Sequence, residues 1–285
     1  MLSKYIILTQ NQIRLSPNPR LALKDYHLNF YFVMKAKIAA EILDEYLSVP
    51  KTLSAVYDKV TIETQKDGLF IKAVDGAHVV LIEAKLPATA FTEYQSENQK
   101  AEYDLAKIKS ILNLAKPNEV IGLETICDDA GKPTKLKFNI GNLTKICGLS
   151  PANENEPKRS NINLPAYAVL PVDDIKRICK GMPYEFSYGN TKLLLTPEEF
   201  ILCSEDETDG IELKLSLKDH STDYKCQEQV CSMFGAEYLI AMMNAVHSDK
   251  IKICIGNNYP AQVEWTSRSG SAPSWCPSAT SASWP

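Results

Sequence analysis

An acidic run between Glu205 and Gly210 is the stretch of this sequence that comes closest to a metal-binding loop. Glu205, Glu207 and Asp209 alternate with other residues and Gly210 follows them, as carboxylates and a glycine do in the first half of a calcium loop. The twelfth position of such a loop would be Ser216 instead of a bidentate glutamate, and the flanking sequence is strand-like. The pattern therefore favours a solvated hairpin turn.

The cysteines and histidines form no recognisable metal or nucleophile motif. Cys226 and Cys231 would need two further ligands nearby, and no Cys or His spacing supplies them. The four histidines lie far apart in sequence, and none stands beside a serine or cysteine in a known nucleophile pattern, so only a triad assembled in space is left open. Glycine-rich phosphate-binding motifs are also missing from the sequence. We therefore predict no catalytic residue, no metal and no cofactor.

A cluster of cations lies on a helix expected after Pro171. Lys176, Arg177 and Lys180 fall within one turn of each other, and such a group can attract the phosphates of a nucleic acid. Spacing alone is equally consistent with ordinary solvated helix residues. A formal net charge of -4 does not argue against DNA contact, because local clusters set the field at a surface.

The composition is that of a globular chain of 285 residues, with 45% hydrophobic and 23% charged residues. No stretch approaches the roughly 18 apolar residues of a membrane span, and the apolar segment at 5–8 is too short for a signal peptide. Most cysteines sit in apolar-periodic stretches without a CxxC pair, which suits a reducing compartment. The sequence thus predicts an intracellular protein with no disulfide framework and no membrane contact.

The elements that would position these residues occur twice. GLFIKAVDGAHVVLIEAKLP at 68–87 aligns with EEFILCSEDETDGIELKLSL at 198–217, which places Ile82 on Leu213 at a spacing of 131 residues. The flanking helical patterns repeat at a similar spacing, at Ile42 and Ile175, and at 105–112 and 239–246. Stacked repeats run about 20 to 50 residues, so each copy here is long enough for its own core. We predict two tandem α+β domains.

Each domain is expected to hold helices and strands in the same order. In the first domain the predicted helices are 39–47, before Pro50, and a helix capped by Asp104 and ended by Pro117, and the predicted strands are 60–63, 69–74, 79–86, 120–126, 134–140 and 143–147. In the second domain we predict a helix after Pro171, strands matching the aligned segments, a helix at 237–246, and strands at 250–255 and 261–265. The Pro-, Asn- and charge-rich stretch 150–167 is predicted to be an exposed connector.

Several of these segments together resemble the sliding DNA clamps of the proliferating cell nuclear antigen (PCNA) family, archaeal members in particular. They are LFIKAVDGAHVVLIEAKLP with Phe91 and Tyr94 after it, DDIKRICKGM at 173–182, IELKLSL at 211–217 and FGAEYL at 234–239. The resemblance implies an α+β fold of two similar clamp domains per chain and three chains per ring, with helices lining a central channel and antiparallel sheets outside. The implied boundaries are 1–33 extension, 34–149 first domain, 150–167 connector, 168–265 second domain and 266–285 atypical tail.

The resemblance also implies three groups of site residues. For double-stranded DNA they are Lys51, Lys107, Lys109, Lys116, Lys176, Arg177 and Lys180. For the subunit interface they are Leu143, Lys145 and Cys147 of one chain against Ile211, Leu213 and Leu215 of the next. For short partner peptides they are Val74, His78, Val79, Leu81, Ile162, Leu164, Pro165 and Pro260. The sequence departs from the family where Ser110, Asn113 and Asn244 replace common basic residues, and where Asp44 and Glu45 are acidic.

The implied function is a clamp that encircles duplex DNA and acts as a processivity factor in DNA replication and repair, without enzymatic activity. The implied partners are the chain itself in a homotrimer, a clamp loader, DNA polymerase, flap endonuclease and ligase. The implied location is cytoplasmic, or nuclear in a eukaryote. One alternative is a subunit of a heterotrimeric clamp. Another is a hydrolase that uses Asp75, Asp128 or Asp129, which would require a cleft with raised carboxylate pKa values.

The end of the chain breaks the repeat. The second domain should finish with a strand equivalent to 143–147, but 269–285 is rich in serine and contains Pro273 and Pro277, which cannot donate to a ladder. We therefore predict that the edge of the strand at 261–265 is left bare.

Overall fold

The structure is a computed structural model that describes residues 34–53, 59–74, 80–152, 164–182, 190–205, 209–266 and 278–279. Asp75, His78, Val79 and Ile162 therefore lie outside the described residues. None of the helices in the described ranges is long and apolar enough to cross a membrane.

Nineteen strands form the sheets of the described chain. They are β1 (Lys35–Ala39), β2 (Lys59–Gln65), β3 (Gly68–Val74), β4 (Val80–Pro87), β5 (Glu93–Gln95), β6 (Gln99–Asp104), β7 (Val120–Cys127), β8 (Pro133–Ile140), β9 (Leu143–Gly148), β10 (Ser150–Pro151), β11 (Ala166–Pro171), β12 (Asn190–Leu195), β13 (Glu199–Glu205), β14 (Gly210–Ser216), β15 (Tyr224–Lys225), β16 (Val230–Gly235), β17 (Lys250–Ile255), β18 (Ala261–Glu264) and β19 (Ser278–Ala279). The helices are α1 (Ala40–Leu53), α2 (Leu105–Leu112), α3 (Val172–Gly181), α4 (Leu217–His220), α5 (Ala236–Ala245) and the 3-10 helix η1 (Ala88–Ala90).

The sheet topology confirms the internal repeat. One sheet has the order β5-β1-β7-β8-β9, and the same order returns as β15-β11-β17-β18-β19. The order β6-β2-β3-β4 likewise returns as β16-β12-β13-β14. All of these pairs are antiparallel. The two halves are thus copies of one α+β unit, and a ten-stranded sheet runs through both because β19 pairs with β4.

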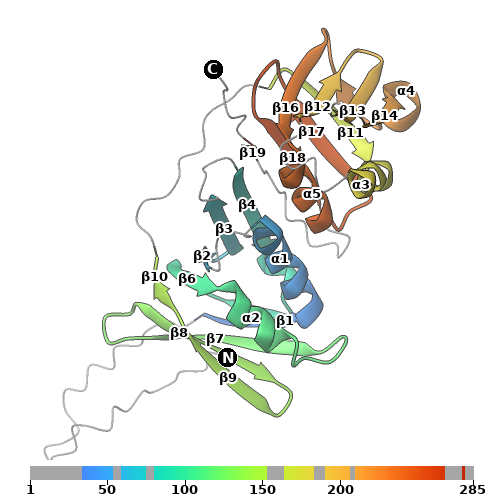
Figure 1. Ribbon diagram of the computed structural model, residues 1–285. Coiled ribbons are helices and arrows are strands. Elements are labelled where there is room, and N and C mark those ends of the chain that lie inside the picture. Colours follow the sequence, from blue (N-terminus) through green and yellow to red (C-terminus); the bar gives the residue numbers. More distant parts are fainter. Residues whose placement is uncertain are drawn as a thin grey trace, which may run out of the picture.

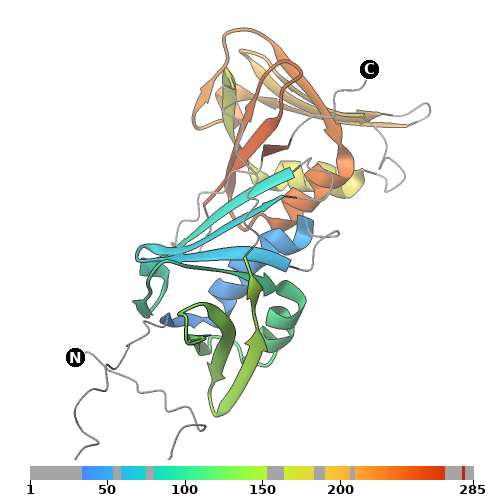
Figure 2. The ribbon, with the colours of Figure 1, turned by 90° about the vertical axis from the view of Figure 1, so that its left-hand side faces the viewer.

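The four longer helices lie on one face of the sheets (Figures 1 and 2). Contacts between α2 and α1, between α1 and α5, and between α5 and α3 order them as a row from the first half to the second. Alternation along the strands supplies the core under this row. In β8, for example, Leu136, Phe138 and Ile140 are buried while the residues between them are half-buried.

Local sequence explains where helices α2 and α3 begin. The Asp104 carboxylate accepts a hydrogen bond of 2.9 Å from the backbone N–H of Lys107 and so caps α2, as predicted. This hydrogen bond is the main cause that lowers the pKa of Asp104. Pro171 precedes α3 directly, where its fixed φ suits a helix start. Helix α2 ends at Leu112, earlier than the predicted end before Pro117.

The predicted end of the first helix before Pro50 is wrong, because α1 continues to Leu53. Pro50 has no N–H and costs the last turn one hydrogen bond. Pro50 is buried, and so are Tyr46 and Leu47 one turn earlier. Burial of this apolar face offsets the missing bond.

The prediction of a bare edge after the last strand is also wrong. Ser278 and Ala279 form β19, which pairs with Gln262 and Ala261 of β18 on one side. On the other side it pairs with β4. The prolines of the tail cannot donate to a ladder, but Ser278 and Ala279, which follow Pro277, both have a backbone N–H and can pair. The tail therefore closes the sheet between the two halves, over two residues only.

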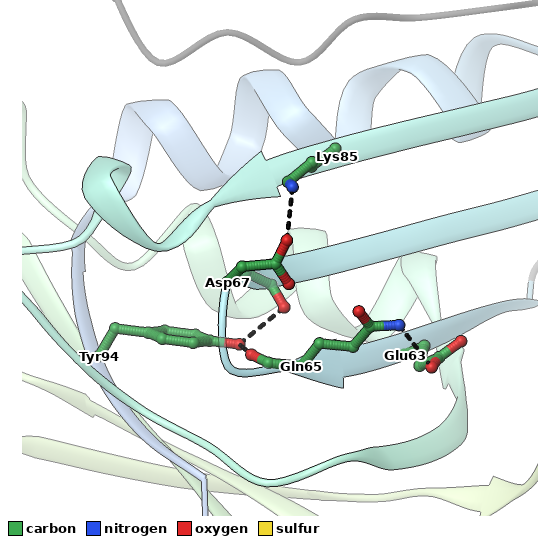
Figure 3. Close-up of polar contacts among 6 residues, drawn as sticks. Glu63, Gln65, Asp67, Lys85 and Tyr94 are labelled. Atoms are coloured by element: carbon green, nitrogen blue, oxygen red, sulfur yellow. Dashed lines mark hydrogen bonds and ion pairs between the residues drawn. The ribbon is translucent and has the colours of Figure 1, made fainter.

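Polar contacts hold the β2–β3 turn against its neighbours (Figure 3). Lys85 Nζ of β4 lies 2.6 Å from the Asp67 carboxylate, and this hydrogen bond is the main cause that lowers the pKa of Asp67. The Tyr94 hydroxyl lies 2.7 Å from the carbonyl oxygen of Gln65 and 2.8 Å from that of Gly68. At Gly68 the φ of 144° and a carbonyl 2.1 Å from any added Cβ require glycine. The β2–β3–β4 meander is thus fixed at this end.

Candidate functional site

Two long edge strands of the described sheets have an open side, β9 and β14. Strand β9 pairs only with β8, and β14 pairs only with β13. Strand β16 is the other edge strand of similar length, but the β17–β18 turn covers it, because Cys231 bonds through its N–H to Asn257 and through its carbonyl to Asn258. Open edges of this length are sites for pairing with another chain.

The predicted interface residues lie on these two edges. Leu143, Lys145 and Cys147 share the face of β9 against which α2 packs. Leu143 is 55% exposed although its neighbours on β8 are buried. Sequence reasoning missed Ile146, which is 49% exposed on the opposite face of β9. An apolar residue at an outward position of an edge strand was the available signal.

On the other edge, Ile211, Leu213 and Leu215 alternate along β14 and face α3. The approach of α3 is close, since a Cβ on Gly181 would lie 2.7 Å from Ile211 Cδ1. Leu215 is buried, whereas Ile211 and Leu213 are half-buried. Each edge therefore offers apolar side chains on the side of its sheet that a helix covers, α2 at β9 and α3 at β14.

The junction inside the chain shows how such edges pair. Strand β19 is the copy of β9, and β4 is the copy of β14. These two copies pair in antiparallel fashion, and α1 contacts α5 beside them. Since α3 is the copy of α1 and α2 is the copy of α5, an equivalent pairing of β9 with β14 of another chain would bring α2 beside α3 of that chain.

Apart from Lys51, the predicted DNA-binding residues lie at the two ends of the helix row. Lys107 and Lys109 are on α2, with the exposed Lys116 after it, and the other end carries Lys176, Arg177 and Lys180 on α3. Lys51 is on α1, and its side chain lies outside the described residues. The structure therefore does not bring the α2 and α3 cations together within one chain.

The three α3 cations differ in their contacts. Lys176 Nζ donates a 2.5 Å hydrogen bond to the carbonyl oxygen of Val246, directly after α5. Arg177 is exposed and lies 3.0 Å from the Asp174 carboxylate. Lys180 is exposed in the last turn. Lys176 thus ties α3 to the C-terminal end of α5, whereas Arg177 and Lys180 project to solvent.

The described members of the predicted peptide site lie in two places, on β3, β4 and the start of β18 around β19, and near the β17–β18 turn. Leu81 of β4 pairs with Ser278, and Val74 of β3 pairs with Leu81, although the Val74 side chain lies outside the described residues. Pro260 is buried directly before β18. Pro165 follows the half-buried Leu164 and approaches the β17–β18 turn, where a Cβ on Gly256 would lie 3.2 Å from its Cδ.

The acidic and thiol groups that the structure describes form no metal-binding arrangement. No group of three metal-ligating side chains is found among the described residues, and the seven cysteines among them are free. Burial raises the pKa of the Cys179 thiol to about 12 and that of Cys254 to about 11. Glu205 of β13 lies opposite Gly210 of β14 in an antiparallel ladder, as a hairpin requires, and residues 206–208 between them lie outside the described residues. Asp128 accepts hydrogen bonds from the N–H groups of Ala130 and Lys132 and so orders a turn.

Comparison with known proteins identifies the family. Residues 39–150 match the family model described as the proliferating cell nuclear antigen, N-terminal domain. A DNA polymerase sliding clamp of Thermoplasma acidophilum is 30% identical over 216 residues, which cover 75% of this chain and 84% of the relative. The chain belongs to the family of DNA polymerase sliding clamps.

Solved clamp structures share the fold. One is the solved structure of the C-terminal region of FEN-1 bound to A. fulgidus PCNA. A chain of that structure aligns with this one with a TM-score of 0.76 at 20% identity, and the alignment covers 88% of this chain and 100% of that one. The PCNA2–PCNA3 complex from Sulfolobus tokodaii aligns with a TM-score of 0.69 at 18% identity, covering 86% and 98%. The family assigns this chain the role of a sliding clamp and does not favour the hydrolase alternative.

Proposed function

We propose that copies of this clamp chain close into a homotrimeric ring through β9 of one chain and β14 of the next. The observation that carries this proposal is the β19–β4 pairing, because it is the same contact made between the equivalent strands within one chain. A head-to-tail contact of this kind is heterologous and forms a closed ring when its rotation divides the circle. The PCNA2–PCNA3 complex from Sulfolobus tokodaii, in which two different clamp chains associate, supports pairing between chains of this fold.

In this proposal the helix row faces duplex DNA. Contacts come from Lys107, Lys109, Lys116, Arg177, Lys180 and Lys51, and Lys176 adds its charge while it also joins α3 to α5. Phosphate contacts of this type are independent of base sequence and weaken steeply with salt. Such contacts suit a ring that moves along DNA.

The ring also carries a docking site for partner peptides beside β19. Its proposed members among the described residues are Leu81, Leu164, Pro165 and Pro260. The family resemblance adds Val74, His78, Val79 and Ile162. A relative with the same fold binds the C-terminal region of FEN-1, which supports flap endonuclease as a partner of this chain. Polymerase, ligase and clamp loader are proposed to use the same site. The chain would thus be a scaffold with no turnover of its own.

Topological linkage to DNA is the experiment that tests this function. The clamp is incubated with a loader and a nicked circular duplex, and the DNA is separated from free protein by gel filtration in high salt. We expect clamp to remain on the circle and to be released when a restriction nuclease linearises it. Equal retention on circular and linear DNA, or none on either, would contradict encirclement.

A further inference from the structure

The charge on the helix row is unevenly divided between the two kinds of junction. Helices α1 and α5, which touch inside the chain, carry net charges of -2 and -1. Helices α2 and α3, at the free ends of the row, carry +2 and +1. Acidic Glu41 is exposed on α1, and α5 contains no lysine or arginine. The attraction for phosphate is therefore concentrated at the two ends of the helix row in each chain, on α2 and α3.

Pairing of β9 with β14 joins these ends. Helix α2 packs on β9 and α3 packs on β14, on the same face of the sheets (Figure 2). By analogy with α1 and α5 at the β4–β19 junction, α2 of one chain then lies beside α3 of the next. Lys107 and Lys109 of one chain and Arg177 and Lys180 of the other form one cationic patch that neither chain has alone.

We propose that duplex DNA binds this clamp mainly at the boundaries between chains, and that it thereby holds the ring closed. This inference rests on the proposed function. A phosphate backbone that contacts both halves of a boundary patch binds the closed ring more tightly than the separated chains. By linkage, a ligand that prefers the assembled state shifts the equilibrium toward it. The junction inside each of the three chains, where the acidic helices α1 and α5 meet, contributes little to DNA binding.

The test measures dissociation of the assembly on dilution at low salt, by mass photometry, with and without a short blunt duplex. A matched pair of triple variants is compared with the unmodified chain. Lys107→Gln, Lys109→Gln and Lys180→Gln remove boundary cations, while Lys132→Gln, Lys192→Gln and Lys225→Gln remove exposed cations away from the helix row. Both variants lose the same charge, and none of these side chains lies on β9 or β14.

The duplex should tighten the unmodified assembly by at least about fivefold, within the usual range of coupling between sites. The control variant should keep this effect and the boundary variant should lose it. The boundary variant should also show a shallower dependence of DNA affinity on salt, by roughly 0.9 in log–log slope for each phosphate that the protein no longer neutralises.

Two results would overturn the inference and leave the clamp function standing. In the first, the duplex binds, as fluorescence anisotropy shows, but does not change dissociation of the unmodified chain. In the second, the two variants lose the effect equally. Failure of the unmodified chain to bind any duplex at low salt, combined with no retention on circular DNA, would remove the proposed function as well.

Discussion

At the scale of single residues, the cations on α3 have different roles although they are adjacent in sequence. Lys176 is half-buried and its ammonium group donates to the carbonyl oxygen of Val246, where a cation also interacts favourably with the negative end of α5. Arg177 is exposed and pairs with Asp174 on its own helix. Exposed pairs of this kind contribute little to stability.

Lys176→Ala should therefore destabilise the fold by about 1.5 kcal/mol, the typical contribution of a hydrogen bond with one charged partner. Arg177→Ala should leave stability nearly unchanged and weaken DNA binding. Urea unfolding and fluorescence anisotropy with a duplex measure the two effects. Equal loss of stability in both variants would show that the Lys176–Val246 contact does not hold α3 to α5.

Tyr94 links β5 to the β2–β3 turn, and its ionisation gives a pH prediction. Burial is the main cause that raises the pKa of Tyr94 to about 12, from an ordinary value of 10. The folded state thus keeps its proton when the unfolded state loses it, so this stabilisation is complete below pH 10 and is lost as the pH rises from 10 toward 12. Melting temperature should fall across this window.

Tyr94→Phe removes the hydroxyl that contacts the Gln65 and Gly68 carbonyls. We expect a loss of about 1 kcal/mol at neutral pH and a smaller fall in melting temperature between pH 10 and pH 11 than in the unmodified chain. Thermal unfolding followed by circular dichroism measures both. An unaltered alkaline fall would assign it to Tyr46 and Tyr103, which are fully buried and whose pKa values are also raised.

At the scale of elements, local patterns predicted most of the fold. The strand predicted at 134–140 corresponds to β8, and Asp104 located the start of α2. The extension of α1 through Pro50 was not predictable because tertiary burial outweighs the local cost of proline. Strand β19 was missed because its two residues carry no strand pattern and owe their pairing to edges supplied by β4 and β18.

The candidate site was predictable to a different extent. The repeat and the family resemblance pointed to residues that the structure places on the edge strands β9 and β14. The division of charge among the helices could not be interpreted from the sequence, because it depends on the order α2, α1, α5, α3 in the row. The separate role of Lys176 depends on Val246, 70 residues away. Contacts at this sequence distance leave no local pattern.

Strand β19 gives a prediction about the junction between the two halves. The residue before it in sequence is Pro277, which has no N–H to donate. Pro277→Val should lengthen β19 and raise stability by about 1 kcal/mol for an added ladder hydrogen bond. Pro273→Val is the control, because it removes a proline from the same tail at a position that is not adjacent to β19 in sequence, and so it corrects for the change in the unfolded chain. If Pro277→Val melts no higher than Pro273→Val, then β19 is not limited by this proline.

At the scale of the whole molecule, the open edge of β9 predicts a change in assembly without a change in fold. Leu143→Lys should separate the chains, because Leu143 is exposed in one chain and its burial against β14 of the next would place a charge in an apolar contact. Met233→Lys is the matched control, since Met233 is also exposed but lies on the covered edge strand β16. Sedimentation velocity should show a smaller species for the first variant only, with both circular dichroism spectra unchanged.

The repetition of the β19–β4 contact between chains is the central claim, and the mass of the assembly tests it most directly. Size-exclusion chromatography with light scattering should give three times the chain mass of 31.8 kDa at micromolar concentration. A single species of 31.8 kDa that persists as the concentration is raised would contradict the claim, because open β9 and β14 edges on every chain would then remain unpaired.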